Sequence, residues 1–247
     1  ELRRRRRDRV RGESWQLQFD GNDANRQKLD YVTDRVTSLE ARMQDEESVE
    51  DDDLAYELEE AQFAVEDAEL AVETGPADPF LDVWFADAQR GFAVGAYGML
   101  YRTDNGGLQW RLAIAGIENV EGYHYYSLDA AADGTLYLSG EAGLLYRSDD
   151  GGENWQRLDA GYDGSLFGVI ALEGDRVICF GLRGNIFTSE DRGETWEDAT
   201  PEDSPGLSYY GGGRFDGGVV MVGAGGVMTS SRDAEVFTSD IHSARNS

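Results

Sequence analysis

Histidine and cysteine, the side chains that most often serve as nucleophiles, proton carriers or metal ligands, are rare in this chain. Its 247 residues include two histidines and one cysteine. His124 and His242 are 118 residues apart and stand in no spacing typical of metal ligands. Cys179 lies in the apolar run 177–180 and is expected to be a small buried hydrophobic residue. We therefore predict no catalytic residue, no metal site and no cofactor.

Hydroxyl, acidic and tryptophan residues instead recur in a fixed order. Segments 101–110, 146–155 and 187–196 align without gaps, and 228–237 keeps the same frame without the glycine. The shared positions are Thr103, Gly107 and Trp110 in the first segment; Ser148, Asp150, Gly152 and Trp155 in the second; and Ser189, Asp191, Gly193 and Trp196 in the third. In a turn, the side-chain oxygens can accept hydrogen bonds from backbone N–H groups, while the tryptophan fills space between strands. We expect these residues to be structural, the alternative being contact with a metal or ligand.

This ten-residue element belongs to a longer repeat. Its closing aromatic residues, Trp110, Trp155, Trp196 and Phe237, lie 45, 41 and 41 residues apart. A turn with two glycines precedes each segment, at 94–98, 139–143, 180–184 and 222–226. In the first unit, four short strands are predicted at 81–86, 91–94, 99–103 and 110–113.

Four-stranded units of this length stack radially as propeller blades. We therefore predict an all-β fold, a β-propeller of about four and a half blades in an incomplete ring, with an inserted α-helical hairpin. Residues 76–247 hold the blades. Residues 1–21 are predicted to belong to a further, partial blade, because 12–15 resemble 193–196.

The inserted segment, residues 22–75, differs from the blades in composition and period. It contains 18 Asp and Glu against four basic residues. Its apolar residues are spaced three and four apart in two sets: Leu29, Val32, Val36, Leu39 and Met43, then Leu54, Leu58, Ala61, Val65, Ala68 and Val72. This heptad spacing predicts two antiparallel helices joined by the acidic connection 44–53.

A projecting hairpin can serve as a docking arm. Tyr31, Tyr56 and Phe63 lie off the predicted seam and would be the contact residues. The alternative is that the two apolar stripes only pack against each other.

Charge and hydropathy limit the partners. The net charge of -27 argues against nucleic acid, because phosphates would be repelled over most of the surface. No apolar run approaches 18 residues, so no transmembrane segment is predicted. The chain begins without a signal peptide, and an extracytoplasmic (periplasmic) location is expected if one has been removed.

The ten-residue element resembles the Asp-box of the bacterial neuraminidase repeat, so a carbohydrate-binding or sialidase-like propeller is the alternative function. A sialidase site needs three converging arginines, whereas Arg102 and Arg147 occupy one equivalent position of the repeat. Its Arg-Ile-Pro motif is absent. His124 lies among Tyr123, Tyr125 and Tyr126 in an aromatic patch that could stack on a sugar or a peptide, with core packing as the alternative. The candidate contact residues in it are Tyr123, His124 and Tyr125.

The whole unit, from 81–87 and 90–95 through Gly98 to the Asp-box, closely resembles the photosystem II stability/assembly factor family of Asp-box propellers. The resemblance covers about 80–237 and the stub before Phe19. It implies a non-enzymatic factor that helps to assemble a membrane protein complex. The non-photosynthetic bacterial branch, which we favour because of the acidic hairpin, is commonly exported and associated with transporters of the resistance-nodulation-division type. A membrane complex or transporter subunit is thus the implied partner.

Overall fold

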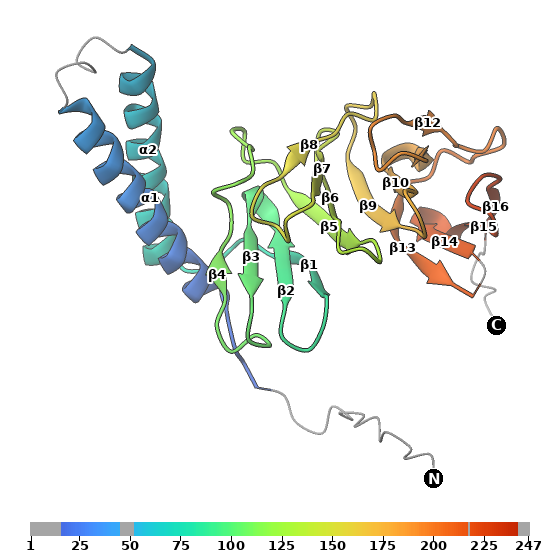
Figure 1. Ribbon diagram of the computed structural model, residues 1–247, viewed down its shortest axis with the longest axis horizontal. Coiled ribbons are helices and arrows are strands. Elements are labelled where there is room, and N and C mark those ends of the chain that lie inside the picture. The colour runs from blue at the N-terminus through green and yellow to red at the C-terminus, as the bar shows by residue number, and fades with distance from the viewer. Residues whose placement is uncertain (1–15, 45–51, 217, 242–247) are drawn as a thin grey trace.

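A helical hairpin and four antiparallel sheets make up the part of the chain that the computed structural model describes, residues 16–44, 52–216 and 218–241. The sheets follow one another in an arc, with the hairpin beyond the first sheet (Figure 1). They do not close into a ring. This confirms the predicted fold class. The segment 12–15, on which the partial blade was predicted, lies outside the described residues, and 16–20 form no regular element.

Each sheet is a meander of four consecutive strands. The first blade comprises β1 (Phe80–Phe85), β2 (Gly91–Gly95), β3 (Leu100–Thr103) and β4 (Arg111–Leu112). The second comprises β5 (Tyr125–Ala130), β6 (Leu136–Gly140), β7 (Leu145–Ser148) and β8 (Gln156–Arg157). The third comprises β9 (Leu166–Ala171), β10 (Val177–Gly181), β11 (Ile186–Ser189) and β12 (Glu197–Asp198). The fourth comprises β13 (Tyr209–Phe215), β14 (Gly218–Gly223), β15 (Val227–Ser231) and β16 (Thr238–Ile241). One-turn 3-10 helices, η2 (Ala96–Gly98), η3 (Leu182–Gly184) and η4 (Ala224–Gly226), follow β2, β10 and β14.

Neighbouring blades are held together by apolar layers and by hydrogen bonds from side chains of one blade to the backbone of the next. The first strands lie side by side, β1 beside β5, β5 beside β9 and β9 beside β13. Leu138 and Ile186 are fully buried in the layers between blades. The Asp82 carboxylate accepts a hydrogen bond from the backbone N of Leu128 at 2.9 Å, and Asp129 does the same for the N of Ala171 at 3.0 Å. Two successive blade junctions thus each contain an aspartate bonded to a backbone N of the next blade, from first-strand positions that differ by two residues.

The hairpin consists of α1 (Gly21–Met43) and α2 (Asp52–Thr74). Asp20 caps α1, accepting hydrogen bonds from the N–H groups of Asn22 and Asp23. The seam follows the predicted heptad positions, with Leu39 and Leu54 buried between the helices. Gly21 has no room for a side chain, because an added Cβ would lie 2.3 Å from Pro76. The hairpin therefore closes tightly at its base.

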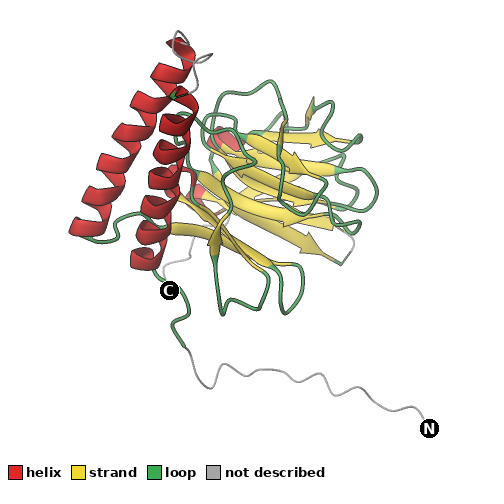
Figure 2. Ribbon diagram, turned by 60° about the vertical axis from the view of Figure 1, so that its left-hand side comes forward, coloured by secondary structure: helices red, strands yellow, loops and turns green. Residues whose placement is uncertain are grey.

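The base of α1 packs on the face of the first blade that points away from the second blade (Figure 2). Phe19 and Ala24 join an apolar cluster with Tyr101 of β3, whose hydroxyl donates to the carbonyl of Ala24 at 3.0 Å. The Gln27 side chain donates to the carbonyl of Trp110 at 2.7 Å and accepts from the N of Leu112 at 2.9 Å. The helical arm is therefore anchored to β4 by both polar and apolar contacts.

Candidate functional site

The Asp-box side chains engage their own turns. The hydroxyl oxygens of Thr103, Ser148 and Ser189 accept from the backbone N of Gly107, Gly152 and Gly193 at 2.9, 2.9 and 2.8 Å. Asp150 accepts from the N of Asn154 at 2.9 Å, and these hydrogen bonds lower the pKa of its carboxyl to about 2. The side chain and the backbone of Thr195 lower the pKa of Asp191 to about 2 in the same way.

The fourth box differs from its predicted frame. Ser231, one residue beyond the aligned position, accepts from the N of Ala234 at 2.9 Å, and Asp233 accepts from Glu235 and Val236. Ala234 adopts a φ of 63°, the left-handed conformation that glycine supplies in the other boxes. The last turn is thus one residue shorter than its counterparts.

The repeat tryptophans and arginines join blades. Trp155 is buried in the layer between the first and second blades, and Trp196 Nε1 donates to the carbonyl of Gly193 at 2.9 Å. Trp110 packs against Phe19 and Phe85.

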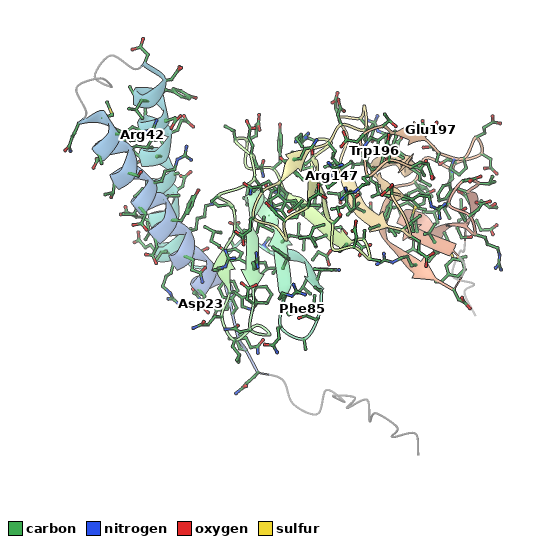
Figure 3. The ribbon with its side chains drawn as sticks, viewed as in Figure 1. Asp23, Arg42, Phe85, Arg147, Trp196 and Glu197 are labelled. Carbon is green, nitrogen blue, oxygen red and sulfur yellow. The ribbon has the colours of Figure 1, made fainter. Side chains whose placement is uncertain are left out.

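Arg102 binds Glu153 of the next blade at 2.6 Å, and Arg147 binds Glu194 at 2.8 Å (Figure 3 labels Arg147 and Trp196). These arginines therefore lie at separate blade junctions and do not converge.

The residues of the predicted aromatic patch have different environments, some in the core and some at the surface. Tyr125 is 1% exposed and lies in the core between blades, so its prediction as a contact residue is wrong. Tyr123 is half-buried, and its backbone is bonded to the side chain of Asn119. His124 remains half-exposed, and its Nδ1 accepts from the N of Tyr97 at 3.1 Å. Only the outer part of the patch can reach a partner.

A larger aromatic surface lies across the first strands of the blades. Each of β1, β5, β9 and β13 shifts register by one residue next to its second position. The bulged residues are Leu81, Tyr126, Phe167 and Tyr210. A β-bulge removes a residue from the ladder and turns its side chain in a new direction. The repeat therefore presents one re-aimed side chain from every blade.

The bulged rings form a continuous row. The centroids of Tyr126 and Phe167 are 4.9 Å apart, and those of Phe167 and Tyr210 are 5.4 Å apart. His124, 6.2 Å from Tyr126, extends the row to Tyr97, a further 4.7 Å away. We call these five residues the aromatic row. Tyr210 is 63% exposed at its end.

Beside the aromatic row is a hollow with a volume of about 350 Å³, lined by residues of β1, β5, β9 and β13. Asp129 faces it and pairs with Arg214 at 2.9 Å, while burial raises the pKa of the Asp129 carboxyl. Arg214 also donates to the carbonyl of Ala171. The hollow thus combines a neutralised charge pair with aromatic faces, which suits a ligand with polar and apolar groups. In the described ranges, no cluster of three or more His, Cys, Asp or Glu could hold a metal ion.

Sequence reasoning missed Tyr97, Phe167 and Tyr210. A signal was present, because Leu81, Tyr126 and Phe167 each precede the first glycine of the two-glycine turn by 14 residues, and Tyr210 precedes it by 13.

Residues 60–237 match the family model described as Photosynthesis system II assembly factor YCF48. The chain belongs to this family. The match includes most of α2, the first three blades and the fourth blade as far as β15, and it confirms the resemblance predicted from the repeat.

Solved structures show the same fold at low identity. A structure of YCF48 bound to D1 peptide has a TM-score of 0.56 and 20% identity, covering 68% of this chain and 55% of that one. YCF48 from Cyanidioschyzon merolae has a TM-score of 0.54 and 19% identity, covering 68% and 57%. The RRP9 WD40 repeats have a TM-score of 0.55 at 10% identity, covering 68% and 52%. The chain spans just over half the length of these relatives. No curated protein matches it in sequence.

None of the helices in the described ranges is both long and apolar enough to cross a membrane.

Proposed function

We propose that the protein is a non-enzymatic scaffold that holds an extended segment of a membrane protein on its aromatic row while a complex is assembled. The bulges are the observation that carries this proposal. A bulge in every blade turns a side chain toward one surface, and three of the four bulged residues are aromatic.

The spacing of the row suits an extended chain. Its ring centroids are separated by 4.7 to 6.2 Å. An extended peptide advances about 3.3–3.6 Å per residue, so successive rings would lie between one and two residues apart along it. Aromatic faces bind apolar and planar groups without requiring one sequence, which suits a factor that handles an incompletely assembled partner.

The family supports a peptide as the ligand. A YCF48 structure contains a D1 peptide, so a related propeller holds a peptide. In this chain Arg102 and Arg147 of the repeat bind glutamates of neighbouring blades, so these two arginines are not free to bind an acidic ligand.

A photo-crosslinking residue in place of Phe167 tests the proposal in the source cells. We expect it to crosslink to an integral membrane protein, identified by mass spectrometry. The same residue in place of Val236, which is exposed outside the row, is the matched control. Equal crosslinking from both positions, or crosslinking from 167 to soluble proteins alone, would contradict the proposal.

We further propose that the protein acts outside the cytoplasm, and that its partner is a subunit of a resistance-nodulation-division type transporter. The resemblance to the non-photosynthetic branch and the acidic hairpin support this choice. Cell fractionation checks the compartment, and the identity of the protein crosslinked at 167 checks the partner.

Half-exposed rings beside a hollow can also stack on sugar rings, which favours a carbohydrate as the second candidate ligand. A glycan array decides between the two. Binding of an oligosaccharide that is lost in Phe167→Ala would favour the carbohydrate-binding or sialidase-like alternative over the peptide scaffold.

A further inference from the structure

Helix α2 carries a second apolar stripe on the side opposite its seam with α1. Tyr56, Phe63 and Leu70 are seven residues apart and are 64%, 55% and 57% exposed. At 100° per residue they lie about 120–180° around the helix from the buried seam residues Ala61 and Ala68. We call these three residues the outer stripe. They span about 21 Å along the helix.

Single exposed apolar residues are common on protein surfaces and need no explanation. Three at heptad spacing on one helix are different, because this is the pattern by which one helix packs against another. Neither α1 nor the blades cover the outer stripe, although α1 buries the seam on the opposite side.

Carboxylates flank the outer stripe on both sides. Glu59 and Glu66 lie three residues beyond Tyr56 and Phe63, and Glu60 and Asp67 lie four residues beyond them. No ion pair joins these four to any other residue in the described ranges. Residues 52–74 contain nine Asp and Glu and no Lys or Arg. An apolar stripe between two acidic rows is complementary to a cationic amphipathic helix.

The same charges disfavour a second copy of α2 as the occupant. Two copies packed along their outer stripes would bring the four flanking carboxylates of each copy close to those of the other, with no basic residue of α2 to compensate.

We propose that the outer stripe binds an amphipathic helix of a partner protein, one with an apolar residue at each heptad position flanked by Lys or Arg. The bound helix lies along α2 and makes the hairpin a three-helix unit. This surface is separate from the aromatic row, so the protein holds two different segments of its partners, one extended and one helical.

The test uses the full chain and a 21-residue helical peptide with leucine at the a and d positions of three heptads and lysine at the e and g positions. Fluorescence anisotropy measures its affinity. The double variant Phe63→Gln and Leu70→Gln should weaken binding at least about tenfold, since buried apolar anchors dominate such interfaces. The matched control, Leu108→Gln with Val236→Gln, removes two residues that are at least as exposed but lie in the blades, and should change affinity less than about twofold.

A second peptide, with the same lysines and glutamine in place of leucine, separates the stripe from general charge attraction. It should bind at least about tenfold more weakly than the first. Equal binding of the two peptides, or equal binding by the stripe variant and wild type, would show attraction to the net negative surface alone and would overturn the proposal. A dimer in sedimentation that the stripe variant abolishes would overturn it in favour of a second copy.

Two further measurements keep these results interpretable. Circular dichroism at 222 nm verifies that the stripe variant keeps its helices, and Leu70→Gln alone replaces it if it does not. Phe167→Ala in the aromatic row should leave binding of the lysine peptide unchanged, so that failure of the row and failure of the outer stripe are distinguished.

Discussion

The blades and the hairpin use charge in opposite ways. In the blades, Arg102, Arg147 and Arg192 bind carboxylates of neighbouring blades at 2.5 to 2.8 Å. In the hairpin, 18 acidic residues face four basic ones, and Arg42 with Glu57 is the one described ion pair between the two helices. Ion pairs between blades therefore join neighbouring sheets, whereas carboxylates of the arm such as Glu59 and Glu66 take part in no described ion pair and can face solvent or a partner.

The blades and the hairpin also differ in how much of their surface is packed against neighbouring elements. Each blade buries aromatic and aliphatic residues on both faces of its middle strands, while the arm buries one narrow seam. A blade thus depends on its neighbours for stability, and the outer part of the arm depends on a few heptad positions. This difference predicts that a destabilising substitution in a blade will affect the neighbouring blades, whereas one in the arm will affect the arm alone.

The largest effect is expected from Phe180→Ala. Phe180 is buried between the third and fourth blades and contacts the ring of Tyr209. Its truncation leaves a cavity that both blades line, and should lower the free energy of unfolding by about 3–5 kcal/mol. Urea unfolding followed by near-ultraviolet circular dichroism measures the loss. Phe215→Ala, at a partly exposed position, is the control and should cost much less.

In the hairpin, Leu39→Ala should cost about 2–4 kcal/mol, because Leu39 is buried in the seam against Leu54. The loss should be confined to the arm. Hydrogen exchange should speed up in the outer halves of α1 and α2 and remain unchanged in β6 and β10. Faster exchange throughout the blades would show that the arm and the propeller unfold as one unit, and would contradict the prediction that the arm unfolds separately.

Ser189→Ala tests the local turn chemistry of the blades. It removes the oxygen that accepts from the buried N of Gly193, and should cost about 1–2 kcal/mol. Thr33→Ala removes an exposed hydroxyl that donates within α1 and should change stability by less than about 0.5 kcal/mol. Thermal unfolding of the two variants compares a turn in the propeller with a solvated position on the arm.

The smallest expected effect is a dependence of the free energy of unfolding on pH in the acidic range. Hydrogen bonds in the boxes lower the pKa of Asp150, Asp191 and Asp233 to about 2 from the usual 3.8. Because the folded pKa lies below the unfolded one, the ionised carboxylates stabilise the fold above pH 4, and this contribution is lost as the pH falls toward 2.

Urea unfolding between pH 4 and pH 2.5 should therefore show a smaller loss for Asp150→Asn with Asp191→Asn than for wild type. The first box carries Asn105 at the equivalent position, and Asn105→Asp should enlarge the loss. An unchanged slope in both variants would mean that the boxes do not control acid stability.

The elements with a strong period were predictable from sequence. The closing tryptophans and paired glycines indicated the four blades, and the heptad spacing of residues such as Leu39 and Leu54 indicated the hairpin. Both patterns depend on contacts within one repeat or one helix pair, so the sequence carries them directly.

The aromatic row was not predictable in the same way. Strand alternation places the adjacent Tyr125 and Tyr126 on opposite faces, but it shows neither which face is buried nor that a bulge at Tyr126 brings its ring next to Phe167. The frame of the fourth box was wrong for a similar reason. Ser230 and Ser231 are both hydroxyl residues, and the pairing of β15 with its neighbours decides which one caps the turn.

The attachment of Gln27 to β4 has a consequence for solubility. The carbonyl of Trp110 and the N of Leu112 point away from β3, and they are the groups by which a strand from another molecule would extend the sheet. The Gln27 amide occupies both. A side chain from the helix thus substitutes for a neighbouring strand, and neither group is free to pair with a strand of another molecule at the outer edge of the first blade.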